Sequence, residues 1–260
     1  MKKPFKTYNG GKAGNGTYQQ IINQIPFHHI YIEPMVGNGG IFHNLRLPML
    51  TLINDIDRSV IDKYDVSAYG GKVIKSNTTY KNILDMCHSY DNIKFVYLDP
   101  PYLFSTRKSK KPLYNYEWTE ADHIEFLTLA SNIECNCMIS HYPCELYDTM
   151  LAGWRTHDFQ SMTRNGLRTE RIYMNYPEPE ILQDYRYTGT DYRERQRIKR
   201  KVARHISKLE ALPNDERNAI LSAVMDKYGA TAVTLNPGNN TKNGCEITAP
   251  KLTMIDHGRN

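Results

Sequence analysis

The segment from Val96 to Tyr102 carries residue types whose spacing could do chemistry. It reads Val-Tyr-Leu-Asp-Pro-Pro-Tyr, an apolar run that ends in an acid, two prolines and an aromatic ring. Adjacent prolines fix the backbone as it leaves a strand, so Asp99 and Tyr102 would be held rigidly at the sheet edge where ligands bind. A purely structural turn with an exposed tyrosine is the alternative.

The group Asp99, Pro100, Pro101 and Tyr102 is suited to an amine whose lone pair is delocalised into a ring, such as that of adenine. Hydrogen bonds from the amine to the Asp99 carboxylate and the Pro100 carbonyl would favour a pyramidal nitrogen that can attack a methyl cation equivalent. A base in a duplex must flip out to reach this geometry, and Tyr102 offers a face on which it could stack.

A glycine-rich loop precedes this segment in the chain. Residues 33–40 read Glu-Pro-Met-Val-Gly-Asn-Gly-Gly and follow a short apolar run, residues 29–33. Glycines there let the backbone approach a ligand closely, and a helix expected over residues 41–47 would present unpaired N–H groups. An ordinary tight turn is the alternative, and a phosphate-binding Walker loop is excluded because no Gly-Lys-Ser/Thr follows.

Acidic residues come next, at the end of the following apolar run. Asp55 stands where such folds place a carboxylate that accepts hydrogen bonds from ribose hydroxyls, with Asp57 as second choice. Asp57 could instead cap the next helix. Near the N-terminus, Lys12 in Tyr-Asn-Gly-Gly-Lys could meet the carboxylate of a bound amino acid, with Tyr8 packing beside it, although a simple turn explains this motif equally well.

The elements that must position these residues alternate between strands and helices. Hydrophobic periodicity predicts strands over residues 51–54, 72–75, 94–98 and 135–140, and helices over residues 58–64, 80–88 and 120–132. This alternation predicts an α/β domain with a mostly parallel sheet.

The character of the chain changes after residue 176. Three domains or segments are expected: a catalytic domain over residues 1–176, a basic helical extension over 177–235 and a tail over 236–260 with little to bury. Between Asp184 and Lys208 there are nine Lys or Arg against three Asp or Glu. Helices are predicted over residues 191–212 and 215–228, the second with Asn214 as N-cap and Gly229 as its stop.

Bulk composition excludes several classes of protein. The 260 residues carry a net charge of +5, which does not repel polyanions, and contain no apolar run long enough for a membrane span. No signal peptide is visible, so a cytoplasmic location is expected. The five cysteines lack zinc-ligand spacing and favour buried thiols.

Taken together and in this order, the motifs resemble the Dam-like N6-adenine DNA methyltransferases of phages and bacterial modification systems. The resemblance covers residues 5–176 and includes all four letters of the catalytic Asp-Pro-Pro-Tyr motif. It implies a Rossmann-like methyltransferase fold with a seven-stranded, mostly parallel sheet and helices on both faces, S-adenosylmethionine as cofactor, and no metal. The implied cofactor-binding residues are Tyr8, Lys12, Glu33, Pro34, Gly37, Gly39, Asp55 and Asp99.

Three departures from that family matter for function. Met35 and Asn38 replace the usual Phe and Ser, and Thr79-Tyr80 lies where Asp-Phe or Asp-Tyr is expected near the adenine ring. Asp55 and Asp99 are 44 positions apart, which leaves no room for the family's large target-recognition insert.

Recognition of the target must then come from other segments. The first candidate is the loop over residues 103–118, which interleaves cations with aromatic rings; the others are residues 161–169 and the basic C-terminal part. The expected DNA-binding cations are Arg107, Lys108, Lys110, Lys111, Arg195, Lys199 and Arg200. A mobile solvated loop and a solvated helix face are the alternatives.

The sequence therefore predicts an adenine-specific DNA methyltransferase that acts on duplex DNA with base flipping. Methylation of cytosine N4 or of RNA adenine, and a catalytically idle DNA-binding protein on the same fold, are the competing hypotheses. Phage self-protection, a restriction partner and regulation all remain open as biological roles. His141, in the segment after the predicted strand 135–140, is expected to form a pocket wall rather than to act as a general base.

Overall fold

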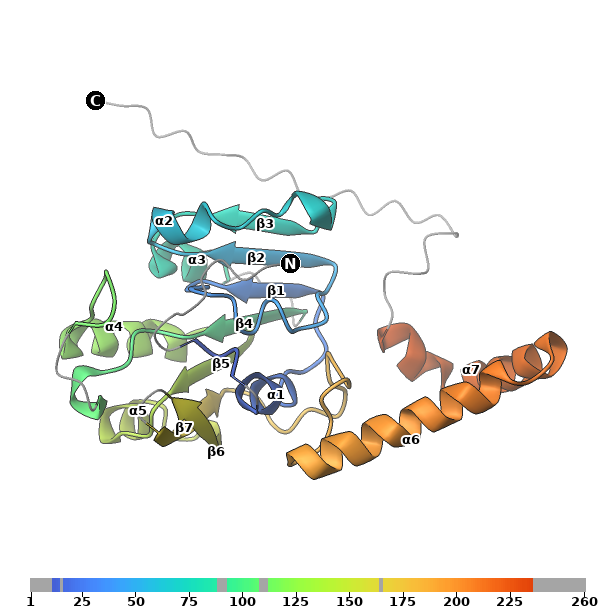
Figure 1. Cartoon of the computed structure of the whole chain (residues 1–260). Coiled ribbons are helices and arrows are strands. Elements are labelled where there is room, and N and C mark those ends of the chain that lie inside the picture. Colours follow the sequence, from blue (N-terminus) through green and yellow to red (C-terminus); the bar gives the residue numbers. More distant parts are fainter. Residues whose placement is uncertain (1–10, 15, 88–92, 108–111, 164–165, 236–260) are drawn as a thin grey trace.

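The computed structural model describes residues 11–14, 16–87, 93–107, 112–163 and 166–235, and its centre is a seven-stranded sheet (Figure 1). The strand order is β3-β2-β1-β4-β5-β7-β6, with the first five strands parallel and β7 and β6 antiparallel. The strands are β1 (Ile30–Glu33), β2 (Leu50–Asn54), β3 (Val73–Ser76), β4 (Lys94–Leu98), β5 (Asn136–His141), β6 (Arg155–Thr163) and β7 (Gly166–Met174).

Helices cover both faces of this sheet. The helices of the domain are α1 (Thr17–Ile22), α2 (Arg58–Ile61), α3 (Tyr80–Asp85), α4 (Glu120–Ser131) and α5 (Glu145–Met150). One core packs α3, α4 and α5 against Ile32, Val96 and Ile139, and the other face holds separate clusters under α1 and α2. The predicted Rossmann-like fold, with a seven-stranded, mostly parallel sheet and helices on both faces, is confirmed.

The central strands explain where a ligand can bind. They are buried almost throughout, which is why they read as continuous apolar runs rather than as alternating ones. The order of the parallel strands reverses between β1 and β4, which lie side by side. Ligands of such sheets bind at this switch point, outside the carboxyl ends of the strands.

One predicted helix of the domain is wrong. Residues 41–45 form hydrogen-bonded turns instead of a helix. In a helix, the Arg46 N–H would donate to the carbonyl four residues earlier. Here it donates instead to the buried carboxylate of Asp184, which is distant in sequence, at 2.9 Å. Pro48 follows two residues later and cannot continue a helix. The glycine loop is therefore followed by a turn and not by a helix N-terminus.

The sheet also contains elements that sequence periodicity did not locate. Neither α1 nor α5 was predicted, and the long hairpin of β6 and β7 appeared only as a segment of unassigned structure. The glycine at position 166, whose φ is +94°, was the local signal that could have indicated the start of the second strand after a turn.

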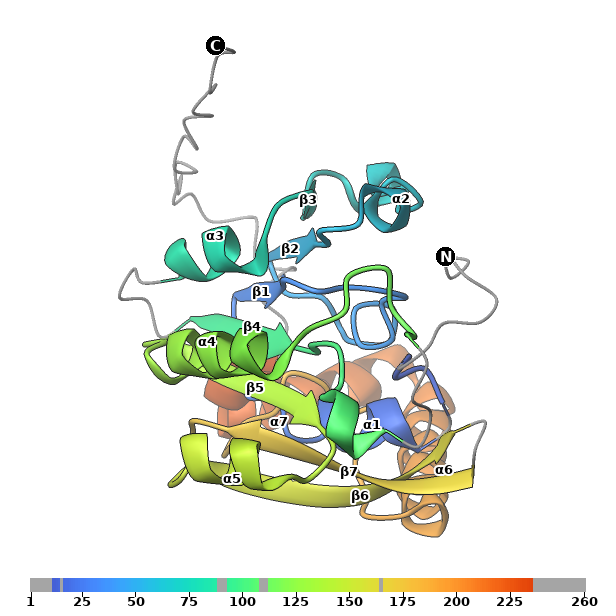
Figure 2. The same ribbon diagram turned by 90° about the vertical axis from the view of Figure 1, so that its left-hand side faces the viewer.

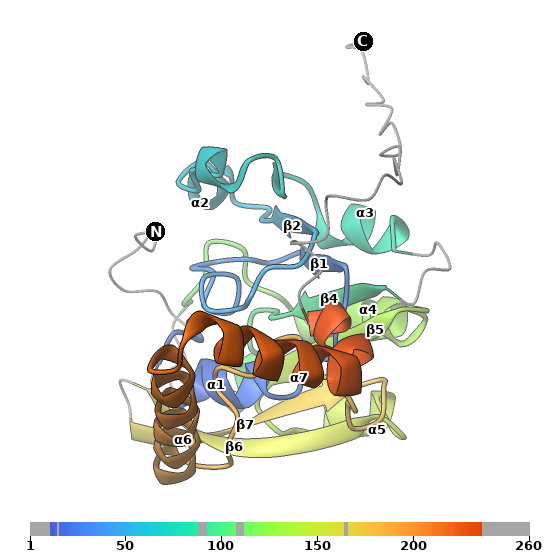
Figure 3. The same ribbon diagram turned by 90° about the vertical axis from the view of Figure 1, so that its right-hand side faces the viewer.

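The chain beyond β7 first runs back along the domain and then leaves it. Residues 181–187 pack against it, through a bridge between Pro26 and Leu182 and through the fully buried Asp184. Two helices follow, α6 (Tyr192–Glu210) and α7 (Asn214–Leu235), and they project from the domain (Figures 1 and 3). No residue of α6 is buried.

The two helices confirm the predicted elements but correct both ends of the second one. Asn214 is the first residue of α7 rather than its cap, and α7 continues through Gly229 to Leu235. Glycine inside a helix costs only about 1 kcal/mol relative to alanine, so the residues that follow can keep the helix going.

Candidate active site

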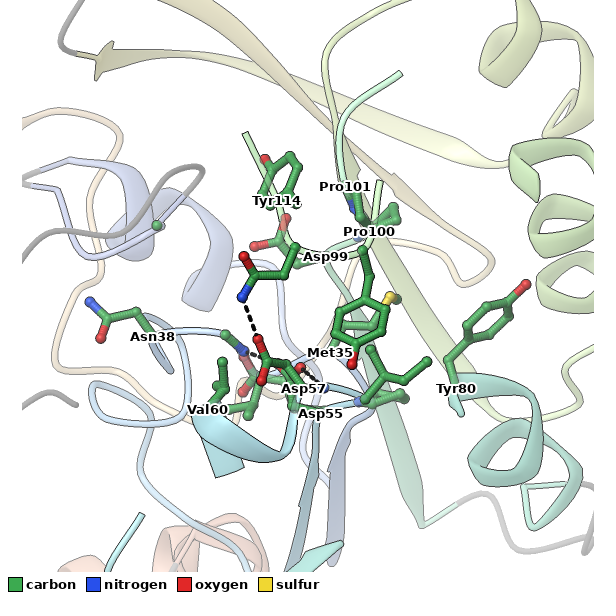
Figure 4. Close-up of a pocket in the computed structure, with 18 of the residues that line it drawn as sticks. Met35, Asn38, Asp55, Asp57, Val60, Tyr80, Asp99, Pro100, Pro101 and Tyr114 are labelled. Atoms are coloured by element: carbon green, nitrogen blue, oxygen red, sulfur yellow. Dashed lines mark hydrogen bonds between the residues drawn. The ribbon is translucent and has the colours of Figure 1, made fainter. Parts of the chain in front are cut away.

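The loops after β1, β2 and β4 meet around one cavity of about 480 Å³ (Figure 4). This volume is in the range of small-molecule sites. Its walls include most of the predicted cofactor residues: Lys12, Glu33, Pro34, Gly37, Asp55 and Asp99. Pro100 and Pro101 also line it. Tyr8 lies outside the described residues.

Two glycines allow close packing in the loop after β1. Gly40 lines the cavity, whereas Gly39, a predicted cofactor residue, does not. Gly39 has a φ of +61°, and a Cβ built on it would lie 2.6 Å from the hydroxyl of Tyr64, which itself donates to the Gly37 carbonyl at 2.9 Å. A Cβ on Gly40 would lie 2.9 Å from the backbone nitrogen of Ala13. Gly40 therefore allows the N-terminal segment to pass directly against the loop, which brings Lys12 into the site.

Glu33 ends β1 and is buried at the cavity wall with 2% of its surface exposed. It accepts a hydrogen bond of 2.8 Å from the hydroxyl of Tyr31. Burial raises the pKa of Glu33 to about 8, against the opposing effect of that hydrogen bond. A cation that entered this cavity would favour the ionised form.

Asp55 and Asp57 have different tasks. Asp55 ties two loops together, because its carboxylate accepts the N–H of Gly37 and the N–H of Asp57, both at 2.9 Å. Asp57 caps α2 through the Ser59 N–H, as the alternative interpretation predicted, and also accepts a 2.7 Å hydrogen bond from Asn115. Both carboxylates line the cavity (Figure 4).

Asp99 is fixed from two sides. Lys12 Nζ lies 2.7 Å from its Oδ1, and the Ser140 hydroxyl donates to the same oxygen at 3.0 Å. Ser140 is in turn 2.9 Å from the Tyr97 hydroxyl. Lys12 therefore lines the cavity and is also held at Asp99, the predicted catalytic acid.

A second carboxylate shares the lysine. Glu170, on β7 and 4% exposed, lies 3.6 Å from Lys12 Nζ and accepts a 3.1 Å hydrogen bond from the Tyr102 hydroxyl. Burial would lower the pKa of Lys12, but Asp99 and Glu170 outweigh it and raise this pKa well above its ordinary value. Lys12 stays protonated between two acids. Sequence reasoning missed Glu170, since an acid in an unlocated strand gives no local signal.

Tyr102 is not open to a base in this structure. Its ring is 4% exposed, Tyr142 lies against it at 4.2 Å between centroids, and Lys12 lies over it at 4.7 Å. The Tyr102 hydroxyl accepts a 2.5 Å hydrogen bond from Lys12 and donates one to Glu170. These two bonds hold the ring in the protein interior. Tyr102 therefore does not offer the exposed face on which a flipped base was expected to stack, and it does not line the cavity.

Three other aromatic residues, Tyr80, Tyr114 and Trp118, line the cavity. Tyr80 and Trp118 lie 5.1 Å apart between centroids, and Figure 4 shows Tyr114 beside Asp99. Tyr80 belongs to the Thr79-Tyr80 pair that departs from the family pattern, and Thr79 caps α3. Tyr80 therefore lines the cavity, but Thr79 precedes it where the resembled family has an aspartate.

His141 is fully buried and is not among the residues that line this cavity, so the expected position in a pocket wall is wrong. The Leu103 N–H donates to its Nε2 at 2.8 Å, and its Nδ1 is 2.8 Å from the Tyr142 carbonyl, so both nitrogens are engaged. Burial lowers the pKa of His141 to about 3. The ring is neutral and stacks on Tyr147 at 3.9 Å.

The predicted DNA-binding cations fall into three groups. Arg107 is buried and bound to Glu117 and to the Tyr102 carbonyl, so it braces the loop after β4 and does not face solvent. Lys108, Lys110 and Lys111 lie outside the described residues. On α6, Lys199 and Arg200 are exposed, whereas Arg195 is half-buried and its guanidinium reaches the Gly189 carbonyl at 3.5 Å.

Two absences apply to the described part of the chain. No group of three His, Cys, Asp or Glu side chains within it could hold a metal ion. No helix within it is long and apolar enough to cross a membrane.

Comparison with known proteins gives no family by sequence: no family model matches the chain, and no curated protein matches it. Similar solved structures include TrmK of M. capricolum with S-adenosyl-homocysteine, at 9% identity and a TM-score of 0.42 over 84% of this chain and 97% of that one. An rRNA methylase from Streptococcus thermophilus matches at 13% identity and 0.38, over 60% and 90%. The magnesium protoporphyrin IX methyltransferase of Synechocystis with bound SAM matches at 12% and 0.38, over 61% and 75%. At such low similarity, function must come from the residues of the site.

Proposed function

We propose that this chain is an S-adenosylmethionine-dependent methyltransferase that modifies the N6 amino group of adenine in DNA. The observation that carries the proposal is the placement of Asp99. It ends a buried strand at the switch point of the sheet, is held by Lys12 and Ser140, and adjoins both a rigid Pro-Pro turn and a ligand-sized cavity.

The cavity fits the proposed cofactor by its chemistry. An acid at the end of β1, Glu33, suits the ammonium group of the methionine part, and the carboxylates of Asp55 and Asp57 suit ribose hydroxyls. Tyr80 and Trp118 offer apolar faces for an adenine ring, and Gly37 and Gly40 present backbone without a side chain at the cavity wall. When bound, the cofactor supplies an electrophilic methyl group on a sulfonium.

The residues of the chain then have defined tasks. Asp99 accepts a hydrogen bond from the target amine and orients its lone pair, and the Pro100 carbonyl is the second acceptor. Lys12 and Ser140 hold the Asp99 carboxylate in place, so little reorganisation is needed at the moment of transfer. The amine loses one proton after it gains the methyl group, and Asp99 is the adjacent carboxylate that can take it.

DNA is the proposed acceptor because the four-letter motif resembles that of the adenine-specific DNA enzymes, and because the exposed cations of α6 suit a polyanion. RNA adenine and cytosine N4 use the same amine chemistry. They are therefore separate outcomes of one assay rather than separate mechanisms.

The assay incubates the purified protein with methyl-labelled S-adenosylmethionine and duplex DNA, single-stranded DNA or RNA of matched sequence, then digests the product and identifies the modified base. N6-methyladenine in DNA is expected. Label found only in RNA, or only in cytosine, would mean that the protein methylates that acceptor instead of adenine in DNA. No transfer at saturating cofactor would falsify the proposal.

The matched variant is Asp99→Asn, which keeps the shape of the side chain and removes the charge. Transfer should fall at least about a thousandfold while calorimetry still detects cofactor binding, as expected for a group that acts mainly on the reacting amine. A catalytically idle binding protein would show no turnover even without the substitution. Retained turnover in Asp99→Asn would remove Asp99 from its role.

A further inference from the structure

The hairpin of β6 and β7 extends past the edge of the sheet at which the site lies. His141, the last residue of β5, pairs with Arg171 of β7, so residues 166–170 and their partners 159–163 continue beyond the parallel strands. Five residues of extended chain span about 17 Å. Figure 2 shows these two strands reaching beyond the end of β5. We call residues 159–163 and 166–170 the arm.

The inner face of the arm is part of the active site. Glu170 contacts Tyr102 and Lys12, as described above. Two residues further out, Arg168 donates to the Thr106 carbonyl at 2.9 Å, and its guanidinium lies 4.9 Å from the centroid of the Tyr142 ring. The arm is therefore braced against the loop that follows the catalytic motif, and its direction is fixed relative to Asp99.

The opposite face of the arm changes character toward its tip. Nearest the sheet, Asp158 and Arg171 form an ion pair at 2.6 Å. Next, Gln160 donates to the Thr169 hydroxyl at 2.9 Å. At the tip the paired residues are Met162 and Leu167, directly opposite each other and 67% and 60% exposed.

These two side chains have no packing role that explains them. They belong to none of the three core clusters, and they are among the most exposed large apolar side chains of the described residues. Apolar pairs at the end of a projecting ribbon are costly in water unless another surface covers them. The position of the arm indicates which surface this is.

We infer that the arm enters the duplex beside the target adenine, with Met162 and Leu167 packing against the bases that the flipped adenine leaves behind. This inference rests on the proposed function. A base delivered to Asp99 keeps its duplex within a few ångströms of the carboxyl edge, so a ribbon that projects about 17 Å from this edge must lie along that duplex.

The dimensions and chemistry agree with such a contact. The major groove is about 12 Å wide and admits a two-stranded ribbon. Apolar side chains inserted between base steps compensate for lost stacking and are a recurrent way of distorting a duplex. The arm also replaces a function that the short interval between Asp55 and Asp99 cannot supply, since no recognition insert fits there.

The test compares duplex and single-stranded substrates in the double variant Met162→Ser with Leu167→Ser. Single strands need no unstacking from a partner strand, so their methylation should stay within about twofold of wild type. Duplex methylation should fall by about tenfold or more, because the variant loses the contacts that offset unstacking. The control is Ile74→Ser, which removes an apolar side chain that is 43% exposed on β3, at the other edge of the sheet.

Each outcome has a distinct meaning. Unchanged duplex activity, or equal losses on both substrates, would overturn the inference. A change in oligomeric state with unchanged duplex activity would assign the apolar tip to a second copy of the chain and would also overturn it. If the wild-type protein methylates neither substrate, the proposed function fails first, and the arm is not the cause. Thermal melting confirms that the variants are folded.

Discussion

Lys12 Nζ lies 2.7 Å from Oδ1 of Asp99, although the two residues are 87 positions apart in the chain. The lysine is 2% exposed and also faces Glu170, so one cation is shared by two buried acids. This arrangement carries a net charge of −1 when both acids are ionised. It suits a site where a cationic cofactor is expected, together with an amine nitrogen that is positively charged after methyl transfer until it loses its proton.

Lys12→Met should destabilise the fold and abolish methyl transfer. The substitution leaves Asp99 and Glu170 close together and buried without a counterion, which costs on the order of 3 kcal/mol in the free energy of unfolding. Urea unfolding and single-turnover methylation measure the two effects. Lys12→Arg separates them, since it keeps the charge but alters the geometry, and should recover more stability than activity. Full activity in Lys12→Met would contradict the assigned role of the pair.

Glu170→Gln should lower kcat by about tenfold with little change in the KM for DNA. It keeps the hydrogen-bond acceptor for Tyr102 but removes one negative charge beside Lys12, so stabilisation of positive charge developing on the amine is weakened. Glu178→Gln, an exposed acid after β7, is the matched control and should behave as wild type. A loss seen only in KM would mean that Glu170 acts on DNA binding instead.

Cofactor affinity should rise with pH up to about 8. The pKa of Glu33 is raised to about 8 by burial, so at pH 6.5 most molecules carry the neutral acid, and a cationic ligand must bind with ionisation of Glu33. Affinity at pH 8.5 should exceed that at pH 6.5 by about tenfold or more, measured by calorimetry. In Glu33→Gln the affinity should be weak and independent of pH over this range. A flat profile in the wild type would separate Glu33 from the cationic part of the ligand.

The raised pKa of Glu33 also affects the stability of the fold. Rising pH should increase cofactor affinity but decrease the free energy of unfolding. Between the ordinary pKa of 4.5 and about 8, the unfolded chain ionises Glu33 while the folded chain keeps it protonated. The folded state then binds more protons, so the contribution of Glu33 to the free energy of unfolding falls as pH rises through this window. Glu33→Gln should remove that part of the pH dependence in urea unfolding, and an unaltered pH profile would argue against it.

Gly40→Ala should reduce activity by displacing the N-terminal segment. The added Cβ would meet the backbone of Lys12 and Ala13 at 2.9 Å, and backbone cannot move aside as a flexible side chain can. Lys12 would shift from Asp99, with a loss of about tenfold or more in transfer rate, since small misplacements in a site have effects of this size. Gly14→Ala is the control, because its Cβ would meet only Thr17 at 3.5 Å. Equal behaviour of the two variants would remove the steric explanation.

Lys199→Gln with Arg200→Gln should weaken DNA binding and flatten its dependence on salt. Both side chains are exposed on α6, and each phosphate contact contributes about 0.9 to the slope of log affinity against log salt, so the slope should fall by about 1.8. Lys72→Gln, at an exposed position just before β3, should leave the slope unchanged. An unaltered slope in the double variant would mean that these two side chains of α6 do not contact DNA phosphates.

Local sequence was sufficient for the centre of the fold. The central parallel strands β1, β4 and β5 are buried on both faces, so their apolar runs stand out from the polar loops around them. The capping box of Thr119 and Asp122 at the start of α4 is also a local signal, because it depends on two residues three positions apart. The site loops follow, since parallel strands bring their carboxyl ends to one edge.

Long-range contacts decided what local sequence could not. Residues 41–47 have helical periodicity, but Asp184 takes the N–H that a helix would need. Arg107 reads as a cation of a basic loop, yet Glu117 and the Tyr102 carbonyl hold it in the interior. Tyr102 reads as a stacking platform, yet hydrogen bonds to Lys12 and Glu170 place its ring beneath the site.

The sequence by itself determined the order of the motifs, the parallel core and the identity of the acid at the end of β4, because each depends on neighbouring residues or on apolar runs. Only the tertiary structure decided the surroundings of that acid. Lys12, Ser140 and Glu170 come from three distant segments, and they meet at Asp99 because β4, β5 and β7 are neighbours in the sheet and Gly40 lets the N-terminal segment pass. Contacts between residues so far apart in the chain produce no periodic pattern in the sequence.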